Sequence, residues 1–137
     1  MKTTVLVVDD RAENRDFLRT LFAFRGWEVL EAANGEQGLD LASARKPDLI
    51  VADVVMPRMD GYDLVRRLRQ NAALAATKVI FYTATYLEDE ARTLAKDCGV
   101  THVIAKPAEP EEILRVVDEV LQIDQKVAPS RPQAAPS

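Results

Sequence analysis

The chain has 137 residues, of which 47% are hydrophobic and 29% are charged, and its net charge is -4. This is the composition of one globular domain with a core, and the mild negative charge argues against non-specific nucleic-acid binding. The single cysteine, Cys98, excludes an intrachain disulfide. The apolar run at residues 5–8 is too short for a signal peptide or membrane span. We therefore expect a cytoplasmic protein that contacts neither nucleic acid nor membrane directly.

Apolar runs that suit buried strands alternate along the chain with segments of helical periodicity. In chain order, the expected strands cover residues 5–8, 27–32, 48–52, 78–83 and 101–105. Each is followed by a segment whose apolar residues recur at a spacing of three or four, which predicts five helices. Five short strands that alternate with helices form a parallel sheet with helices on both faces, so we expect a doubly wound α/β fold of the (βα)5 type.

Local signals mark the ends and faces of the predicted helices. The apolar face of the first helix is expected to comprise Phe17, Leu18, Leu21, Phe22 and Phe24. Gly26 then suits a C-cap. The pair Asn34-Gly35 favours a helix start over a hairpin turn, because helical spacing follows it, and Pro47 ends that helix. The third helix is expected to turn three arginines toward solvent, Arg66, Arg67 and Arg69.

The composition of the chain changes at about Asp124. Residues 124–137 contain three prolines together with alanine and serine and carry little apolar bulk. Such a segment cannot pack a core and is typical of a linker or disordered tail. We therefore place the globular domain at residues 1–123 and expect it to be the N-terminal part of a larger protein.

Polar residues fall at the carboxyl ends of four predicted strands, which is where parallel α/β sheets bind ligands. They are Asp9 and Asp10, Asp53, Thr83, and Lys106. Carboxylates directly after buried strands repel one another unless they are paired, hydrogen-bonded or bound to a cation. A hard divalent cation such as Mg²⁺ would neutralise them, and the lysine would add a fixed positive charge. The set predicts a phosphoryl site at this edge of the sheet.

Some of these residues also have simpler structural interpretations. Asp10 with Glu13 fits a capping box at the start of the first helix. Thr83 alone suits a β-branched strand position, and Lys106-Pro107 alone suits a loop. The coincidence of all the polar residues at strand ends nevertheless favours a functional site.

Four motifs in this order resemble the receiver domain of two-component response regulators: Val7-Val-Asp-Asp10, Asp53-Val-Val-Met-Pro57 with Asp60-Gly61, Thr83-Ala84 and Lys106-Pro107. The resemblance spans residues 2–123 and implies the flavodoxin-like strand order 2-1-3-4-5. It implies that Asp53 accepts a phosphoryl group from a sensor histidine kinase or a phosphotransfer protein. The chain would then be a signalling phosphoacceptor, and not an enzyme beyond self-phosphorylation and slow autodephosphorylation.

The same resemblance assigns roles to the other strand-end residues. It implies a Mg²⁺ site formed by Asp9, Asp10, Asp53 and the backbone carbonyl of Val55, with Asp9 acting through a water molecule. Thr83 and Lys106 would bind oxygens of the phosphoryl group. The signal would leave through the surface of the fourth helix, fifth strand and fifth helix, toward an output domain, a downstream protein or a second copy in a homodimer.

The chain departs from the common receiver pattern at two positions. Many receivers carry an aromatic residue three positions before the lysine, and this chain has Val103. Some receivers carry a polar residue two positions after the acceptor that guides hydrolytic water, and here that residue is Val55, while Thr85 lies two positions after Thr83. We also expect the Lys106-Pro107 peptide bond to be cis.

Two other classes of protein were weighed against a phosphorylated receiver. A pseudoreceiver that docks proteins without phosphorylation would not need the complete set of acids, threonine and lysine that this chain retains. A flavodoxin-like redox protein would need a phosphate-cradling loop after the first strand, where Asp10-Arg-Ala-Glu13 stands instead. No glycine-rich nucleotide-binding motif occurs in the sequence.

Overall fold

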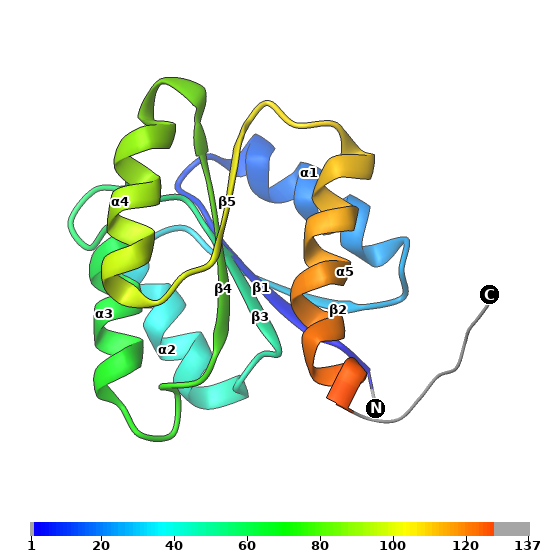
Figure 1. Ribbon diagram of the computed structural model, residues 1–137, viewed down its shortest axis with the longest axis horizontal. Helices are drawn as coiled ribbons and strands as arrows, with labels where there is room; N and C mark the ends of the chain where they lie inside the picture. The colour runs from blue at the N-terminus through cyan, green and yellow to red at the C-terminus, as the bar shows by residue number, and fades with distance from the viewer. Residues whose placement is uncertain (1, 128–137) are drawn as a thin grey trace.

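The chain forms a parallel five-stranded sheet in the computed structural model, which describes residues 2–127 (Figure 1). The strands are β1 (Thr4–Val8), β2 (Glu28–Ala32), β3 (Leu49–Ala52), β4 (Lys78–Ala84) and β5 (His102–Lys106). Their order in the sheet is β2-β1-β3-β4-β5. The predicted α/β class and the predicted strand order are both confirmed.

Five helices cover the two faces of this sheet, with α1 and α5 on one face and α2, α3 and α4 on the other (Figure 1). Their bounds are α1 (Ala12–Ala23), α2 (Gly35–Arg45), α3 (Gly61–Gln70), α4 (Glu88–Cys98) and α5 (Pro110–Val127). A 3-10 turn, η1 (Thr85–Leu87), joins β4 to α4. Across residues 2–127, none of the helices has the length and apolar character needed to cross a bilayer.

The end of α5 bears on the predicted domain boundary. We placed the end of the domain at Ile123, whereas α5 extends to Val127. The helical pattern therefore continues for a turn into the segment that the sequence assigned to the linker. The remainder of that segment, residues 128–137, lies outside the described residues.

The central strands β1 and β3 are buried on both faces. Leu6 and Val8 face the core under α2, α3 and α4, whereas Val5 and Val7 face the core under α1 and α5. Successive residues of a strand point to opposite faces, so a strand covered on both sides is apolar throughout. This burial fixes the backbone of both strands and with it the position of the residue that follows each of them.

One expectation for the first helix is wrong, and one alternative interpretation of its start is not realised. The phenylalanines at the ends of its predicted apolar face are not buried: Phe17 is 38% exposed and Phe24 is 90% exposed. Phe24 is the C-cap of α1 and keeps helical backbone angles, φ -58° and ψ -30°, so it lies in solvent because its position around the helix falls outside the buried face. Gly26, with φ 77°, lies in the turn beyond. The capping box of Asp10 with Glu13 does not form either, because Arg11 is the N-cap and its side chain caps nothing.

The start of the second helix is confirmed, and the solvent face of the third needs one correction. The side chain of Asn34 accepts a hydrogen bond of 2.9 Å from the N–H of Gln37 and so caps α2.

Arg69 is not a solvent-facing residue: its guanidinium donates to the backbone carbonyls of Cys98, Ala75 and Thr77, at 3.1, 3.0 and 2.7 Å. It turns inward because these carbonyls, at the end of α4 and in the loop before β4, lack regular partners.

Candidate functional site

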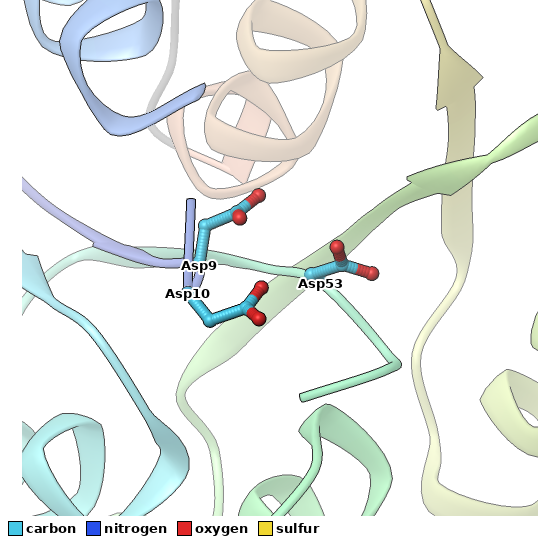
Figure 2. Close-up of side chains that lie close together, drawn as sticks. All are labelled: Asp9, Asp10 and Asp53. Atoms are coloured by element: carbon cyan, nitrogen blue, oxygen red, sulfur yellow. The ribbon is translucent and has the colours of Figure 1, made fainter. Parts of the chain in front are cut away.

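The pairing of β1 with β3 brings two carboxylates to the same edge of the sheet. Val8 lies opposite Ala52 in the register, and the N–H of Asp53 donates to the carbonyl of Val8 at 3.0 Å. Asp9 and Asp53 are therefore the first residues beyond two adjacent buried strands. Figure 2 shows their side chains together with that of Asp10 just past the strand ends.

The three carboxylates form a compact acidic cluster. One oxygen from each of Asp9, Asp10 and Asp53 lies within 4.8 Å of the others. Asp9 is 2% exposed and Asp53 is 8% exposed, whereas Asp10 faces solvent. Hard oxygen donors at this spacing suit a divalent cation such as Mg²⁺, which prefers carboxylates together with water. The donor set therefore fits the predicted metal, and the predicted convergence of the three acids is confirmed.

Lys106 supplies the fixed positive charge that the sequence predicted. Its Nζ lies 2.8 Å from Oδ2 of Asp9 and 2.8 Å from Oδ2 of Asp53, so it bridges the two buried acids. Burial opposes the charged form of the lysine, but the hydrogen bonds and charges of Asp53 and Asp9 outweigh it and raise the pKa of Lys106. The lysine stays protonated at neutral pH and cancels one of the three negative charges.

Asp9 is held by α1 as well as by the lysine. Its Oδ1 accepts a hydrogen bond from the N–H of Arg11 at 2.9 Å, and the amide of Asn14 donates to both carboxylate oxygens at 3.3 Å. Arg15 donates to the backbone carbonyl of Asp9 at 2.7 Å. Asp9 thus has a full set of donors, which leaves Asp10 and Asp53 as the acids better placed to contact a metal directly.

The two donors on α1 are functional neighbours that the sequence pattern does not predict. Asn14 and Arg15 were not singled out, although both lie in the first turns of the helix that follows the acidic pair. Their position is the signal that could have identified them, because the first turns of a helix after a strand end lie beside that strand end.

The loop after Asp53 is shaped by the start of α3. The N–H of Val55 donates to Oδ1 of Asp53 at 3.2 Å, and the N–H of Gly61 donates to the carbonyl of Val54 at 2.9 Å. The side chain of Asp60 caps α3 by accepting from the N–H of Asp63 at 2.8 Å. The Asp60-Gly61 pair therefore packs the helix start directly against the backbone of Asp53 and Val54.

Thr83 and the bond after Lys106 complete the site. Thr83 is fully buried in β4, and its Oγ1 has no hydrogen-bond partner among the described residues. Buried hydroxyls rarely lack a partner, so this one is suited to an oxygen that reaches the strand ends from outside. Thr83 pairs with Ala105 in the sheet, one residue before the lysine. The Lys106-Pro107 peptide bond is cis, as predicted.

The family model of the response regulator receiver domain matches residues 5–118. The chain belongs to the response regulator receiver family. Receivers bind Mg²⁺ as a rule, and they interact with histidine kinases or phosphotransfer proteins and with output domains. The acidic cluster, the bridging lysine and the buried threonine of this receiver are thus the features expected of the family, on the strand order that the family shares.

Relatives of this receiver differ in length. It is 32% identical over 117 residues to the protein PilH of Pseudomonas aeruginosa, covering 85% of this chain and 96% of PilH. It is 32% identical over 130 residues to the alkaline phosphatase synthesis transcriptional regulatory protein PhoP of Bacillus subtilis, covering 95% of this chain but 53% of PhoP. Among solved structures, the chemotaxis protein CheY4 of Vibrio cholerae superposes with a TM-score of 0.82 at 30% identity, covering 88% of this chain and all of CheY4.

Proposed function

We propose that this receiver accepts a phosphoryl group on Asp53 in a Mg²⁺-dependent reaction and acts as a switch, not as a turnover enzyme. The observation that carries the proposal is the position of Asp53: it follows a buried strand, lies in a cluster of three carboxylates, and has Oδ2 2.8 Å from Nζ of Lys106. A carboxylate fixed in this way beside a cation is a positioned nucleophile. The donor would be the phosphohistidine of a sensor kinase or of a phosphotransfer protein.

Each residue of the site would have a different role in phosphoryl transfer. One carboxylate oxygen of Asp53 forms a bond to phosphorus while the bond from phosphorus to the donor nitrogen breaks, and that nitrogen keeps the electron pair. Lys106 neutralises charge on the phosphoryl oxygens, and the unpaired hydroxyl of Thr83 donates to one of them. Mg²⁺, held by Asp10, Asp53 and the backbone carbonyl of Val55, would supply further charge neutralisation.

We propose that this receiver works in the cytoplasm as part of a larger signalling protein. Receipt of a phosphoryl group from a histidine kinase would take place in the cytoplasm, and the signal would leave through the α4-β5-α5 surface to an output domain, a downstream protein or a second copy. The receiver would be the N-terminal part of a larger regulator or hybrid sensor. PhoP, of which this chain covers 53%, is a relative that extends beyond the receiver, whereas PilH, covered to 96%, is not longer. The Pro- and Ala-rich residues after Asp124 would then be the linker.

Phosphorylation by acetyl phosphate tests the assignment of Asp53. In Mg²⁺ the wild-type protein is expected to gain the mass of one phosphoryl group, and in excess EDTA it is expected to gain none. Asp53→Asn is expected to gain none in either condition, because an amide is a poor nucleophile, whereas Asp40→Asn on the exposed side of α2 should behave as the wild type. A phosphoryl group on Asp53→Asn, measured by intact mass, would place the acceptor elsewhere.

The lifetime of the phosphorylated form should depend on Val55. Its side chain is 55% exposed at the mouth of the site and offers no hydrogen bond to an attacking water molecule. The hydroxyl of Thr85 is already engaged with the backbone carbonyl of Lys106. We expect Val55→Asn to speed dephosphorylation about fivefold, the effect of one hydrogen bond of about 1 kcal/mol. Loss of phosphoryl mass is followed after the donor is removed, with Val55→Leu as the apolar control; equal rates for the two variants would refute control by side-chain polarity.

A further inference from the structure

We infer that Thr85 is a positioning residue that couples Lys106 to α4, so that occupancy of Asp53 reaches the start of α4 through the backbone of the lysine. The inference rests on the proposed phosphorylation of Asp53. Its basis is a hydrogen bond of 2.6 Å from Oγ1 of Thr85 to the backbone carbonyl of Lys106. Thr85 is the first residue of η1, which runs directly into α4.

This hydrogen bond means that Lys106 is held at both of its ends. Its Nζ is fixed by Asp9 and Asp53, each at 2.8 Å, and lies 5.3 Å from the centre of the Tyr82 ring. Its carbonyl is fixed by Thr85. A displacement of the ammonium group can therefore be passed through one residue from the acidic cluster to the turn before α4.

The start of α4 depends on few other side-chain hydrogen bonds. Ala84 caps η1 and Leu87 caps α4, and neither has a side chain that can accept a hydrogen bond from the helix. Helix starts without a capping side chain are less stable than those capped by Ser, Thr, Asp or Asn. The hydroxyl of Thr85 instead ties this segment to β5, so a change at Lys106 would act on a weakly anchored helix end.

A link between Lys106 and the start of α4 matters in this chain because Val103 stands where many receivers have an aromatic residue. Many receivers have an aromatic residue at this position, three before the lysine, whereas Val103 is a partly buried side chain packed against the core under α2, α3 and α4. A valine has no large ring that could move between exposed and buried positions. The contact of Thr85 with Lys106 connects β5 to the start of α4 without such a residue.

Phosphorylation would disturb the lysine directly. At present Nζ is shared between two carboxylate oxygens. A phosphoryl group on Asp53 adds three acceptor oxygens and charge beyond the carboxylate, and these attract the ammonium group away from its present position. Since the carbonyl of the same residue is bonded to Thr85, the turn Thr85–Leu87 is expected to shift with it.

The hydrogen bond can be tested without any phosphodonor. Thr85→Val keeps the shape of the side chain and removes the donor, whereas Thr85→Ser keeps the hydroxyl. In the full-length protein we expect the carbonyl ¹³C resonance of Lys106 to move in the valine variant and to stay close to its wild-type position in the serine variant. The same resonance in all three proteins would overturn the inference and would leave the proposed phosphorylation of Asp53 untouched.

The coupling is tested on the phosphorylated proteins. Intact mass after treatment with acetyl phosphate and Mg²⁺ gives the extent of phosphorylation, and amide hydrogen exchange gives the response of residues 85–92. The three proteins are compared at equal phosphoryl content, which is set by the time of treatment. The exchange response should be retained in Thr85→Ser and about fivefold smaller in Thr85→Val, the factor that corresponds to one hydrogen bond.

The outcomes separate this inference from the proposed function. A wild-type response in phosphorylated Thr85→Val, or no response of residues 85–92 in the phosphorylated wild type, would overturn the coupling role of Thr85. Failure of all three proteins to gain a phosphoryl group would overturn the proposed function and, with it, the coupling that depends on it. If the hydrogen bond of Thr85 were merely structural, Thr85→Val would lower the stability of the protein but leave the exchange response of residues 85–92 per phosphoryl group unchanged, and this result would also overturn the coupling.

Discussion

Lys106→Met is expected to slow phosphorylation by acetyl phosphate by a factor of about 10²–10³, the effect of removing one preorganised donor from the charge that develops in a transition state. The reason is geometric: Nζ of Lys106 lies 2.8 Å from Oδ2 of Asp53, beside the atom that would be phosphorylated. Methionine has a similar length and apolar stem but no charge. The rate is measured from intact mass at early times in saturating Mg²⁺.

The same substitution is expected to lower the free energy of unfolding by up to about 3 kcal/mol, the lower end of the range for breaking a buried ion pair. Asp9 would remain buried without its cation but would keep its hydrogen bonds from Arg11 and Asn14, which limits the loss. Urea denaturation measures the change, with Lys96→Met on the exposed face of α4 as the matched control. If Lys106→Met matches that control in both stability and phosphorylation rate, the lysine has no role in the site.

The pKa of Lys106 sets the pH range of this stabilisation. The folded-state pKa is raised above the ordinary value of 10.5, because the interactions with Asp53 and Asp9 outweigh burial. The contribution is therefore fully present below pH 10.5 and is lost as the pH rises through the folded-state pKa. Burial also raises the pKa of Tyr82, so this tyrosine ionises more readily in the unfolded state. The wild type and Lys106→Met therefore both lose stability in alkali for this second reason. The difference between wild type and Lys106→Met should therefore be constant from neutral pH to about 10 and should narrow above it.

The sheet and its ligand edge could be predicted because short buried strands are recognisable in the sequence as unbroken apolar runs. Val5–Val8 and Leu49–Ala52 are unbroken apolar runs, and each is followed at once by aspartate. In a parallel sheet, all such ends lie at one edge, so the strand assignments place Asp9 and Asp53 at the same edge. That their two strands are neighbours follows from the strand order that the resemblance to receivers implies, which the pairing of β1 with β3 confirms. No knowledge of side-chain conformation was needed for that step.

The features that the sequence did not predict depend on side-chain direction and on the width of a buried helix face. Helical periodicity assigns Phe24 to the apolar face of α1, but the buried face is narrower and consists of Leu18, Leu21 and Phe22. Arg69 was expected in solvent because arginine is usually exposed, whereas here loop carbonyls draw it inward. The hydrogen bond of Thr85 joins the 3-10 turn η1 to the end of β5, 21 residues later in the chain. Spacing along the chain carries no information about such contacts.

Gly61→Ala is expected to reduce the free energy of unfolding by about 3 kcal/mol, the upper end of the usual range for overpacking. A Cβ at this position would lie 2.2 Å from the carbonyl oxygen of Asp53 and 3.0 Å from Cα of Val54. Both atoms belong to the backbone, so no side chain can move aside to make room. The N–H of Gly61 also donates to the carbonyl of Val54 at 2.9 Å, which holds the two segments together.

The substitution should also impair phosphorylation, because the clash falls on the backbone of the acceptor itself. Relief of the contact requires α3 or Asp53 to shift, and a displacement of about 1 Å can lower the rate of a positioned reaction about 10²-fold. Gly38→Ala in α2 is the comparison: its Cβ would meet side-chain methyl groups of Val8 at 3.0 and 3.2 Å instead of backbone atoms at 2.2 Å, so we expect a smaller loss, offset in part by the helix propensity of alanine. Urea denaturation and phosphorylation rates are compared for the two variants. Wild-type stability in Gly61→Ala would mean that the loop after Asp53 is not held against α3, and the close packing of this loop could then not be what positions the acceptor.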